Sequence, residues 1–399
     1  MSAHDANEKI AGLQTKGLMV GGVGLVACGA AWAMDAERFY QAYLPGYLFW
    51  LAASLGCLGW TMIHHLTEGK WGFPVRRIWE AGSRTVWIMI PLFIPIFMGM
   101  HTLFSWTSPE AAHDPILVGK ASYLNVGFFT VRAALYFVIW SGLAFLLSSW
   151  SSKQDEEEVE PMRTKMRKLS GAGILMMAIT VTFMSVDWAM SVDPHWFSTI
   201  FGFLFAASDL LMGMAITILV AKMLWDYEPF HKAVKVSTFH DLGNLLMAFT
   251  MLWGYMAFSQ FLIIWSGNTQ EEIPWYLVRN DDAWNIITVI LIVFHFCVPF
   301  LVLLTRRTKR APSTLIKVAA WLIVMRYIDL YWLVMPSLGS HGGDTHGAPF
   351  HPSWMDLAVP IALGGIWLGF FAMQLKSRNL APVADPRFQE ALADTGGHH

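Results

Sequence analysis

The chain has 399 residues, of which 55% are hydrophobic and only 14% are charged, and its mean hydropathy is +0.45. Soluble proteins contain about one quarter charged residues, so this composition excludes an ordinary soluble domain. The net charge of −2 provides no basic surface for nucleic acid. The three cysteines, Cys28, Cys57 and Cys297, lie far apart in apolar runs, which excludes covalent haem c and a cysteine-ligated iron–sulfur cluster in this chain.

The apolar residues fall into ten runs of about 20, the helix length that crosses a bilayer. In chain order, the predicted membrane helices cover residues 17–34, 44–66, 84–104, 124–149, 171–190, 198–222, 242–265, 285–305, 315–336 and 356–375. Pro91 and Pro95 are expected to interrupt the third helix, and Pro299 the eighth. The first run has no signal-peptide cleavage pattern behind it, so we expect a retained helix. The prediction is an all-α membrane protein with one polytopic domain, residues 1–399.

The basic residues are distributed unequally between the two sets of connections. Of the 27 lysines and arginines, 22 lie in the N-terminal segment, the even-numbered loops and the C-terminal tail, and three lie in the odd-numbered loops. Cytoplasmic loops collect basic residues, so both termini, including the tail 376–399, are predicted to be cytoplasmic. Within the second loop, Val75–Arg84 (VRRIWEAGSR) is expected to lie on the membrane surface as an amphipathic segment.

Ionisable residues within membrane helices are costly to bury and are candidate functional residues. One group lies near the outer ends of the third to fifth helices and comprises His101, Arg132 and Asp187. These side chains could form one outward-facing polar cluster. A structural ion pair between Arg132 and Asp187 is the alternative.

A second group lies near the middle of the membrane, on the sixth, eighth and ninth helices. It comprises Asp209, His295, Arg326 and Asp329. Arg326 and Asp329 are three residues apart and share a helix face, which favours a neutralising pair. Asp209 has no partner on its own helix, whereas a single buried histidine such as His295 is often a packing residue.

We hypothesise a proton half-channel that opens to the cytoplasm. A carboxyl group and an imidazole in low dielectric can both exchange protons near neutral pH, as in the relays of pumps. His240 and Asp241 mark the cytoplasmic end of the seventh helix. The hypothetical path therefore comprises His240, Asp241, Asp209, His295 and the Arg326–Asp329 pair.

Neither a metal site nor a haem b site is predicted. The ninth loop contains His341, His346, His351 and Asp344, but four glycines make it too loose to define a metal site. Haem b requires two histidines at the same depth on facing helices. His101 and His295 differ in depth by about 10 Å.

Four strings are more specific than composition. They read DWAMSVDPHWFSTIFG at Asp187–Gly202, HDLGNLLMAFTMLWGYMAFSQFLIIW at His240–Trp265, RYIDLYWLVMP at Arg326–Pro336 and PVADPRFQE at Pro382–Glu390. With these strings, residues 40–390 resemble the membrane subunits of alternative complex III, a bacterial quinol:cytochrome c oxidoreductase. That family belongs to the polysulfide-reductase membrane-anchor superfamily, also called NrfD-like. The compact length is similar to that of the shorter, F-type subunit.

The resemblance implies a fold of two four-helix bundles. Helices 2–5 (residues 44–190) form the first bundle and helices 6–9 (residues 198–336) the second, with helices 1 and 10 peripheral. It also implies quinol oxidation at the outer side of the first bundle. The implied partners are a paralogous membrane subunit, an iron–sulfur subunit and c-type haem subunits, together with lipids. Haem and iron–sulfur clusters are then expected only in partner subunits.

His101 and Asp187 fall where quinol-facing residues would be useful, but Arg132 departs from that pattern because a cation does not accept protons from quinol. We therefore expect a subunit of the bacterial inner membrane that has no redox centre, scaffolds the complex and conducts protons. Two alternatives stay open. In one, this chain binds quinone or quinol at His101, Arg132 and Asp187; in the other, it is an unrelated secondary transporter.

Overall fold

A computed structural model of the chain describes residues 2–155, 159–228, 230–280, 282–338, 350–382, 385 and 388. Within these ranges the chain is helical and contains no strand. Ten of the helices there are long and apolar enough to cross a membrane, which confirms the predicted all-α multi-pass architecture. Several helices extend beyond the predicted bounds, because their amphipathic ends continue past the apolar run.

The first bundle contains α2, whose most apolar 18-residue stretch is 89% buried. Its members are α2 (Ala36–Thr67), α3 (Arg76–Arg84), α4 (Val86–Leu92), α5 (Ile94–Met98), α6 (Met100–Leu103), α8 (Val126–Lys153) and α9 (Val159–Trp188). The short pieces α3 to α6 together form the third membrane helix. Pro91 and Pro95 interrupt it as predicted, since neither has a backbone N–H to donate.

The second bundle contains α10 (Phe201–Leu224), α12 (Val236–Gly267), α14 (Asp282–Ile290), the π-helical segment η5 (Leu291–Cys297), α15 (Val298–Leu304) and α17 (Pro312–Val334). The predicted eighth membrane helix is thus continuous from α14 to α15 and includes a π-helical stretch. Pro299 is the second residue after this stretch and cannot donate a hydrogen bond to the carbonyl of His295 four residues earlier. The wider π-helical turn accommodates the absence of this backbone hydrogen bond.

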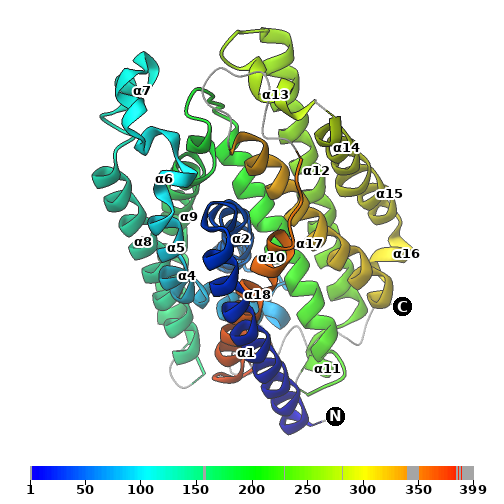
Figure 1. Cartoon of the computed structure of the whole chain (residues 1–399). Coiled ribbons are helices and arrows are strands. Elements are labelled where there is room, and N and C mark those ends of the chain that lie inside the picture. The colour runs from blue at the N-terminus through cyan, green and yellow to red at the C-terminus, as the bar shows by residue number, and fades with distance from the viewer. Residues whose placement is uncertain are drawn as a thin grey trace.

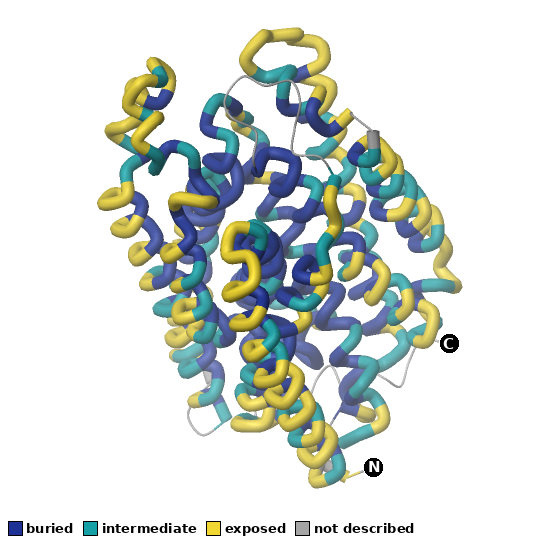
Figure 2. The backbone as a smooth tube through the Cα atoms, in the orientation of Figure 1, coloured by how far each residue is buried: buried dark blue, intermediate teal, exposed yellow. Residues whose placement is uncertain are grey.

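The two bundles meet where α2 crosses α10, in the buried centre of the molecule (Figure 2). A Cβ atom on Gly56 would lie 1.9 Å from the carbonyl oxygen of Asp209, and one on Gly213 would lie 2.6 Å from the carbonyl carbon of Gly56. Only glycine allows two helix backbones to approach this closely. The contact fixes the part of α10 that carries Asp209 against the first bundle.

Two further helices cover one side of the bundles (Figure 1). α18 (Met355–Lys376) packs on α2, and α1 (Ala3–Met34) lies along α18. The α1–α18 contact is also close, because a Cβ atom on Gly24 would lie 2.4 Å from Cβ of Ala362. The opposite face of α1 is exposed and apolar, as expected for a helix that faces lipid.

Short helices fill the connections at both ends. Those at the outer end are η2 (Ser105–Thr107), η3 (Pro109–His113), α7 (Pro115–Lys120), η4 (Met190–Val192), α13 (Ile273–Arg279) and η6 (Met335–Ser337). Those at the other end, which carries the basic loops and which we call cytoplasmic, are η1 (Phe73–Val75), α11 (Phe230–Ala233) and α16 (Arg306–Lys309). Figure 1 shows α7 and α13 at the opposite end from α11 and the N-terminus.

A histidine–carboxylate contact joins two of the outer loops. Nε2 of His195 lies 2.6 Å from Oδ2 of Asp114, whose Oδ1 accepts hydrogen bonds from the backbone N–H groups of Ile116 and Leu117 at the start of α7. Partial burial raises the pKa of the Asp114 carboxyl group, but the bonds from His195, Ile116 and Leu117 outweigh it. The pKa is therefore held below its ordinary value of 3.8.

Candidate functional site

A cluster of five side chains lies inside the second bundle. This mid-membrane cluster comprises Asp209 on α10, Trp253 on α12, His295 in η5, and Arg326 and Asp329 on α17. None of the five residues is more than 5% exposed. Asp209 is eight residues from the outer end of α10, a depth of about 12 Å. The structure thus brings together the four mid-membrane residues predicted from the sequence.

Arg326 joins two carboxyl groups. Its Nη1 lies 2.5 Å from Oδ2 of Asp329, and its Nη2 lies 3.7 Å from Oδ1 of Asp209. The first contact is the pair expected from the spacing along α17, whereas the second crosses from α17 to α10. Asp329 also accepts a 3.3 Å hydrogen bond from Nε1 of Trp253. Because Oδ2 of Asp209 has no hydrogen-bond partner among the described residues, Asp209 is the less compensated carboxyl group.

The charges of the cluster do not balance when both carboxyl groups are ionised. In the described part of the chain, Arg326 is the one cation within ion-pair distance of Asp209 or Asp329. An uncompensated charge buried in the membrane is costly, by several kcal/mol or more. The cluster is neutral when one carboxyl group carries a proton. The arrangement can therefore hold one exchangeable proton.

His295 is fully buried in the π-helical segment and stacks on Trp253, with ring centroids 4.0 Å apart and ring planes at 18°. Neither ring nitrogen has a hydrogen-bond partner among the described residues. Trp253 therefore contacts both Asp329 and His295, a role that the sequence analysis missed. The position of Trp253 in the middle of its membrane helix could have indicated this role, since tryptophan in membrane helices is typical of the interface.

The cytoplasmic end of α12 is separate from the mid-membrane cluster. Nδ1 of His240 lies 3.6 Å from Oδ1 of Asp241, and both side chains are partly exposed. Trp253 is thirteen positions after His240 on α12, a distance of about 20 Å along the helix. Between them, Leu246 is buried, and the buried hydroxyl of Thr250 donates to the carbonyl of Leu246 in its own helix. The structure thus does not bring His240 and Asp241 into contact with the cluster.

Arg132 and Asp187 form a closed pair in the first bundle. Nε and Nη2 of Arg132 donate to the two oxygens of Asp187 at 2.9 and 2.8 Å, and the hydroxyl of Tyr136 donates to Oδ2 at 2.6 Å. The guanidinium also stacks on Tyr123, 3.8 Å from the ring centre. These contacts satisfy Asp187, and the pair bridges α8 and α9.

The remaining candidates are not part of these sites. His101 lies on α6 with an exposed side chain, and none of the described hydrogen bonds or ion pairs includes it. His351 is also exposed. His341, Asp344 and His346 lie outside the described residues.

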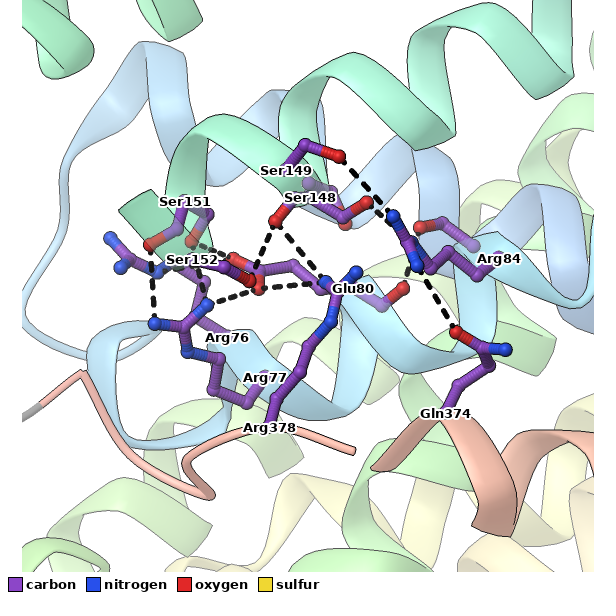
Figure 3. Close-up of polar contacts among 12 residues, drawn as sticks. Arg76, Arg77, Glu80, Arg84, Ser148, Ser149, Ser151, Ser152, Gln374 and Arg378 are labelled. Carbon is purple, nitrogen blue, oxygen red and sulfur yellow. Dashed lines mark hydrogen bonds and ion pairs between the residues drawn. The ribbon is translucent and has the colours of Figure 1, made fainter. Parts of the chain in front are cut away.

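Of the predicted surface segment Val75–Arg84, the residues up to Ser83 are buried and only Arg84 is partly exposed, which corrects the expectation that the segment lies on the membrane surface. Its charges are compensated in what we call the α3 network, which comprises Arg76, Arg77, Glu80, Ser151, Asp155 and Asp385. Figure 3 shows Arg76, Arg77, Glu80 and Ser151 of this network. Glu80 lies 3.3 Å from Arg76 and 2.9 Å from Arg77. The spacing of these residues indicated pairs within the helix. It could not indicate that the segment after α8 and the C-terminal tail supply the other carboxylates, those of Asp155 and Asp385.

Neither the protein-family models nor the sequences of characterised proteins give a match to this chain.

Proposed function

We propose that this chain is a proton-carrying membrane subunit of a bacterial respiratory quinol:electron-acceptor oxidoreductase of the alternative complex III type, located in the bacterial inner membrane. A paralogous membrane subunit, an iron–sulfur subunit and c-type haem subunits complete the complex and contain its redox centres. The four sequence strings support membership in the complex. The observation that carries the proton role is the mid-membrane cluster, in which one guanidinium serves two buried carboxyl groups.

Asp209 is the proton carrier in this proposal. It lies farther from Arg326 than Asp329 does, 3.7 Å against 2.5 Å, so its ionised form is the less stabilised of the two. Its free Oδ2 can accept and release the proton. Asp329 meanwhile stays ionised and holds Arg326 in place. His295 stacks on Trp253, which donates to Asp329, and so packs beside the cluster.

Access from the cytoplasm requires hydration of the inner half of the bundle. His240 and Asp241 collect protons at the end of α12, and apolar side chains such as Leu246 separate them from Asp209. Proton uptake therefore depends on transient entry of water between α12 and α17 during turnover. Coupling to electron transfer in the partner subunits would control that step.

The closed pair in the first bundle supports this reading over the quinol-binding alternative. A quinol-facing carboxylate needs a free oxygen to accept a proton. Both oxygens of Asp187 are already engaged by Arg132 and Tyr136, and His101 does not contact them. The pair is suited to hold α8 against α9.

Purification of the tagged chain in mild detergent tests membership in the complex. We expect multihaem and iron–sulfur polypeptides to co-purify, with a c-type haem spectrum and quinol-dependent reduction of an acceptor. The same tag on an unrelated polytopic protein of the same cells provides the control. A colourless chain that purifies alone would contradict the proposal and favour the secondary transporter.

A further inference from the structure

Two arginines meet at one turn of α8 at the cytoplasmic end of the first bundle (Figure 3). Arg84, the last residue of α3, donates to the hydroxyl oxygens of Ser148 and Ser149 at 2.8 and 3.2 Å. Arg378 follows α18 and donates to the backbone carbonyl of Ser148 at 3.2 Å. Arg84 is partly exposed and the Arg378 side chain is 12% exposed, so an external group can reach this site from the membrane surface.

The site has an excess of positive charge. Among the described residues, Arg84 has no carboxylate partner, and its third contact is the neutral amide oxygen of Gln374 at 3.4 Å. The nearest carboxylate to Arg378 is that of Glu80 at 4.0 Å, which the arginines of the α3 network already share. Burial lowers the pKa of Arg378 to about 10, and the positive charge of Arg84 contributes to this shift while Glu80 opposes it. A bound anion would relieve this repulsion.

An apolar surface lies next to the two arginines on the membrane side. Trp87 is one turn beyond Arg84, and Phe145 is one turn before Ser148 and Ser149, so both rings lie about 5 Å deeper in the membrane. The two rings pack 6.0 Å apart, and the guanidinium of Arg84 lies 5.5 Å from the centre of the Phe145 ring. Their exposed fractions are 47% and 45%. A polar cationic site therefore continues into an exposed aromatic surface.

We propose that this site binds one anionic phospholipid of the cytoplasmic leaflet. Arg84 and Arg378 bind the phosphodiester, and the acyl chains lie over Trp87 and Phe145. Guanidinium groups form strong charge-assisted hydrogen bonds with phosphate oxygens, and basic pockets at the cytoplasmic ends of membrane helices suit anionic headgroups. The lipid connects α3, α8 and the segment after α18. This inference is independent of the proposed proton role.

Native mass spectrometry of the full-length protein, titrated with phosphatidylglycerol or with phosphatidylcholine of the same acyl chains, tests the proposal. We expect phosphatidylglycerol to bind about tenfold more tightly or better, and Arg84→Gln/Arg378→Gln to remove that preference. The matched control is Arg306→Gln/Arg307→Gln, which removes two exposed cytoplasmic charges at another loop and should change the affinity less than about twofold. Equal binding of both lipids, or a preference that survives in the Arg84/Arg378 variant, would overturn the site.

Two further measurements keep the proposal testable if the double glutamine variant does not fold. Trp87→Ala leaves every described polar contact of Arg84 in place, and we expect it to weaken phosphatidylglycerol binding severalfold, whereas Leu135→Ala on an exposed face of α8 should not. Inorganic phosphate is the second probe. If phosphate alone binds as tightly as phosphatidylglycerol, or if Trp87→Ala has no effect, the site is not a lipid site.

Discussion

The charge balance of the mid-membrane cluster predicts a specific pattern of single and double variants. In Asp209→Asn, Arg326 keeps the ionised Asp329, and in Asp329→Asn it can pair with an ionised Asp209. Each single variant is therefore neutral without a bound proton, so we expect both to assemble. Asp209→Asn/Asp329→Asn leaves the Arg326 guanidinium buried without a carboxylate.

The distances give the size of these effects. At an effective dielectric constant of about 20, a guanidinium stabilises a carboxylate by about 6.6 kcal/mol at the 2.5 Å of Asp329 and by about 4.5 kcal/mol at the 3.7 Å of Asp209. The difference of about 2 kcal/mol corresponds to a preference of about thirtyfold for the proton on Asp209. Removal of both carboxyl groups should lower the free energy of unfolding by about 3–5 kcal/mol, the usual cost of an unpaired buried charge.

Infrared spectroscopy and thermal denaturation in detergent measure both quantities. The parent protein should show the C=O stretch of a protonated carboxyl group that resists exchange with bulk water, and Asp209→Asn should lack it. The double variant should unfold at a markedly lower temperature than either single variant. A protonated-carboxyl band that survives in Asp209→Asn, or a double variant as stable as the single ones, would refute the charge-balance reasoning.

Three further outcomes are expected elsewhere in the fold. Asp187→Asn removes the anionic partner of Arg132 and should lower the free energy of unfolding by about 3–5 kcal/mol, seen as a lower melting temperature in detergent; an unchanged value would show that the pair is dispensable. Gly56→Ala places a methyl group 1.9 Å from the backbone of α10 and should reduce the yield of monodisperse protein, whereas Gly142→Ala, with no atom within 4 Å of the new Cβ, should match the parent. Folding lowers the pKa of Asp114, so its carboxylate stabilises the outer loops at any pH above its ordinary pKa of 3.8. This stabilisation is lost as the pH falls through the pKa of Asp114 in the folded protein. Asp114→Asn should therefore make residues 105–123 easier to cleave with protease at neutral pH but not at a pH below that value, and equal cleavage at neutral pH would contradict it.

The membrane helices could be predicted from the sequence because run length and loop charge are independent signals that agree. The Arg326–Asp329 pair was equally accessible, since residues three apart share a helix face whatever the tertiary structure. The contact between Arg326 and Asp209 could not be predicted, because the depths of two residues in the membrane do not show how their helices are rotated about their axes. The rotation of α10 is fixed by its close contact with α2 at Gly56. The sequence contains this glycine but does not indicate which helix packs against it.

Other differences arise where the helix period changes or where distant segments meet. His101 has a depth similar to that of Asp187. Because Pro91 and Pro95 interrupt the third helix, the direction in which the His101 side chain points could not be predicted from the helix period. The π-helical turn likewise shifts His295 relative to an ideal helix and places it on Trp253. The burial of α3 depends on partners from α8 and the C-terminal tail, which no local pattern identifies.

The role of Asp209 as a proton carrier can be measured as the ratio of protons taken up from the cytoplasmic side to electrons transferred by the purified complex in vesicles. Asp209→Asn should assemble and transfer electrons from quinol at near the parent rate, with a reduced proton ratio. Glu271→Gln, which removes an exposed carboxylate from an outer loop, should keep the full ratio. An assembled, active Asp209→Asn complex that retains the full proton ratio would contradict the account.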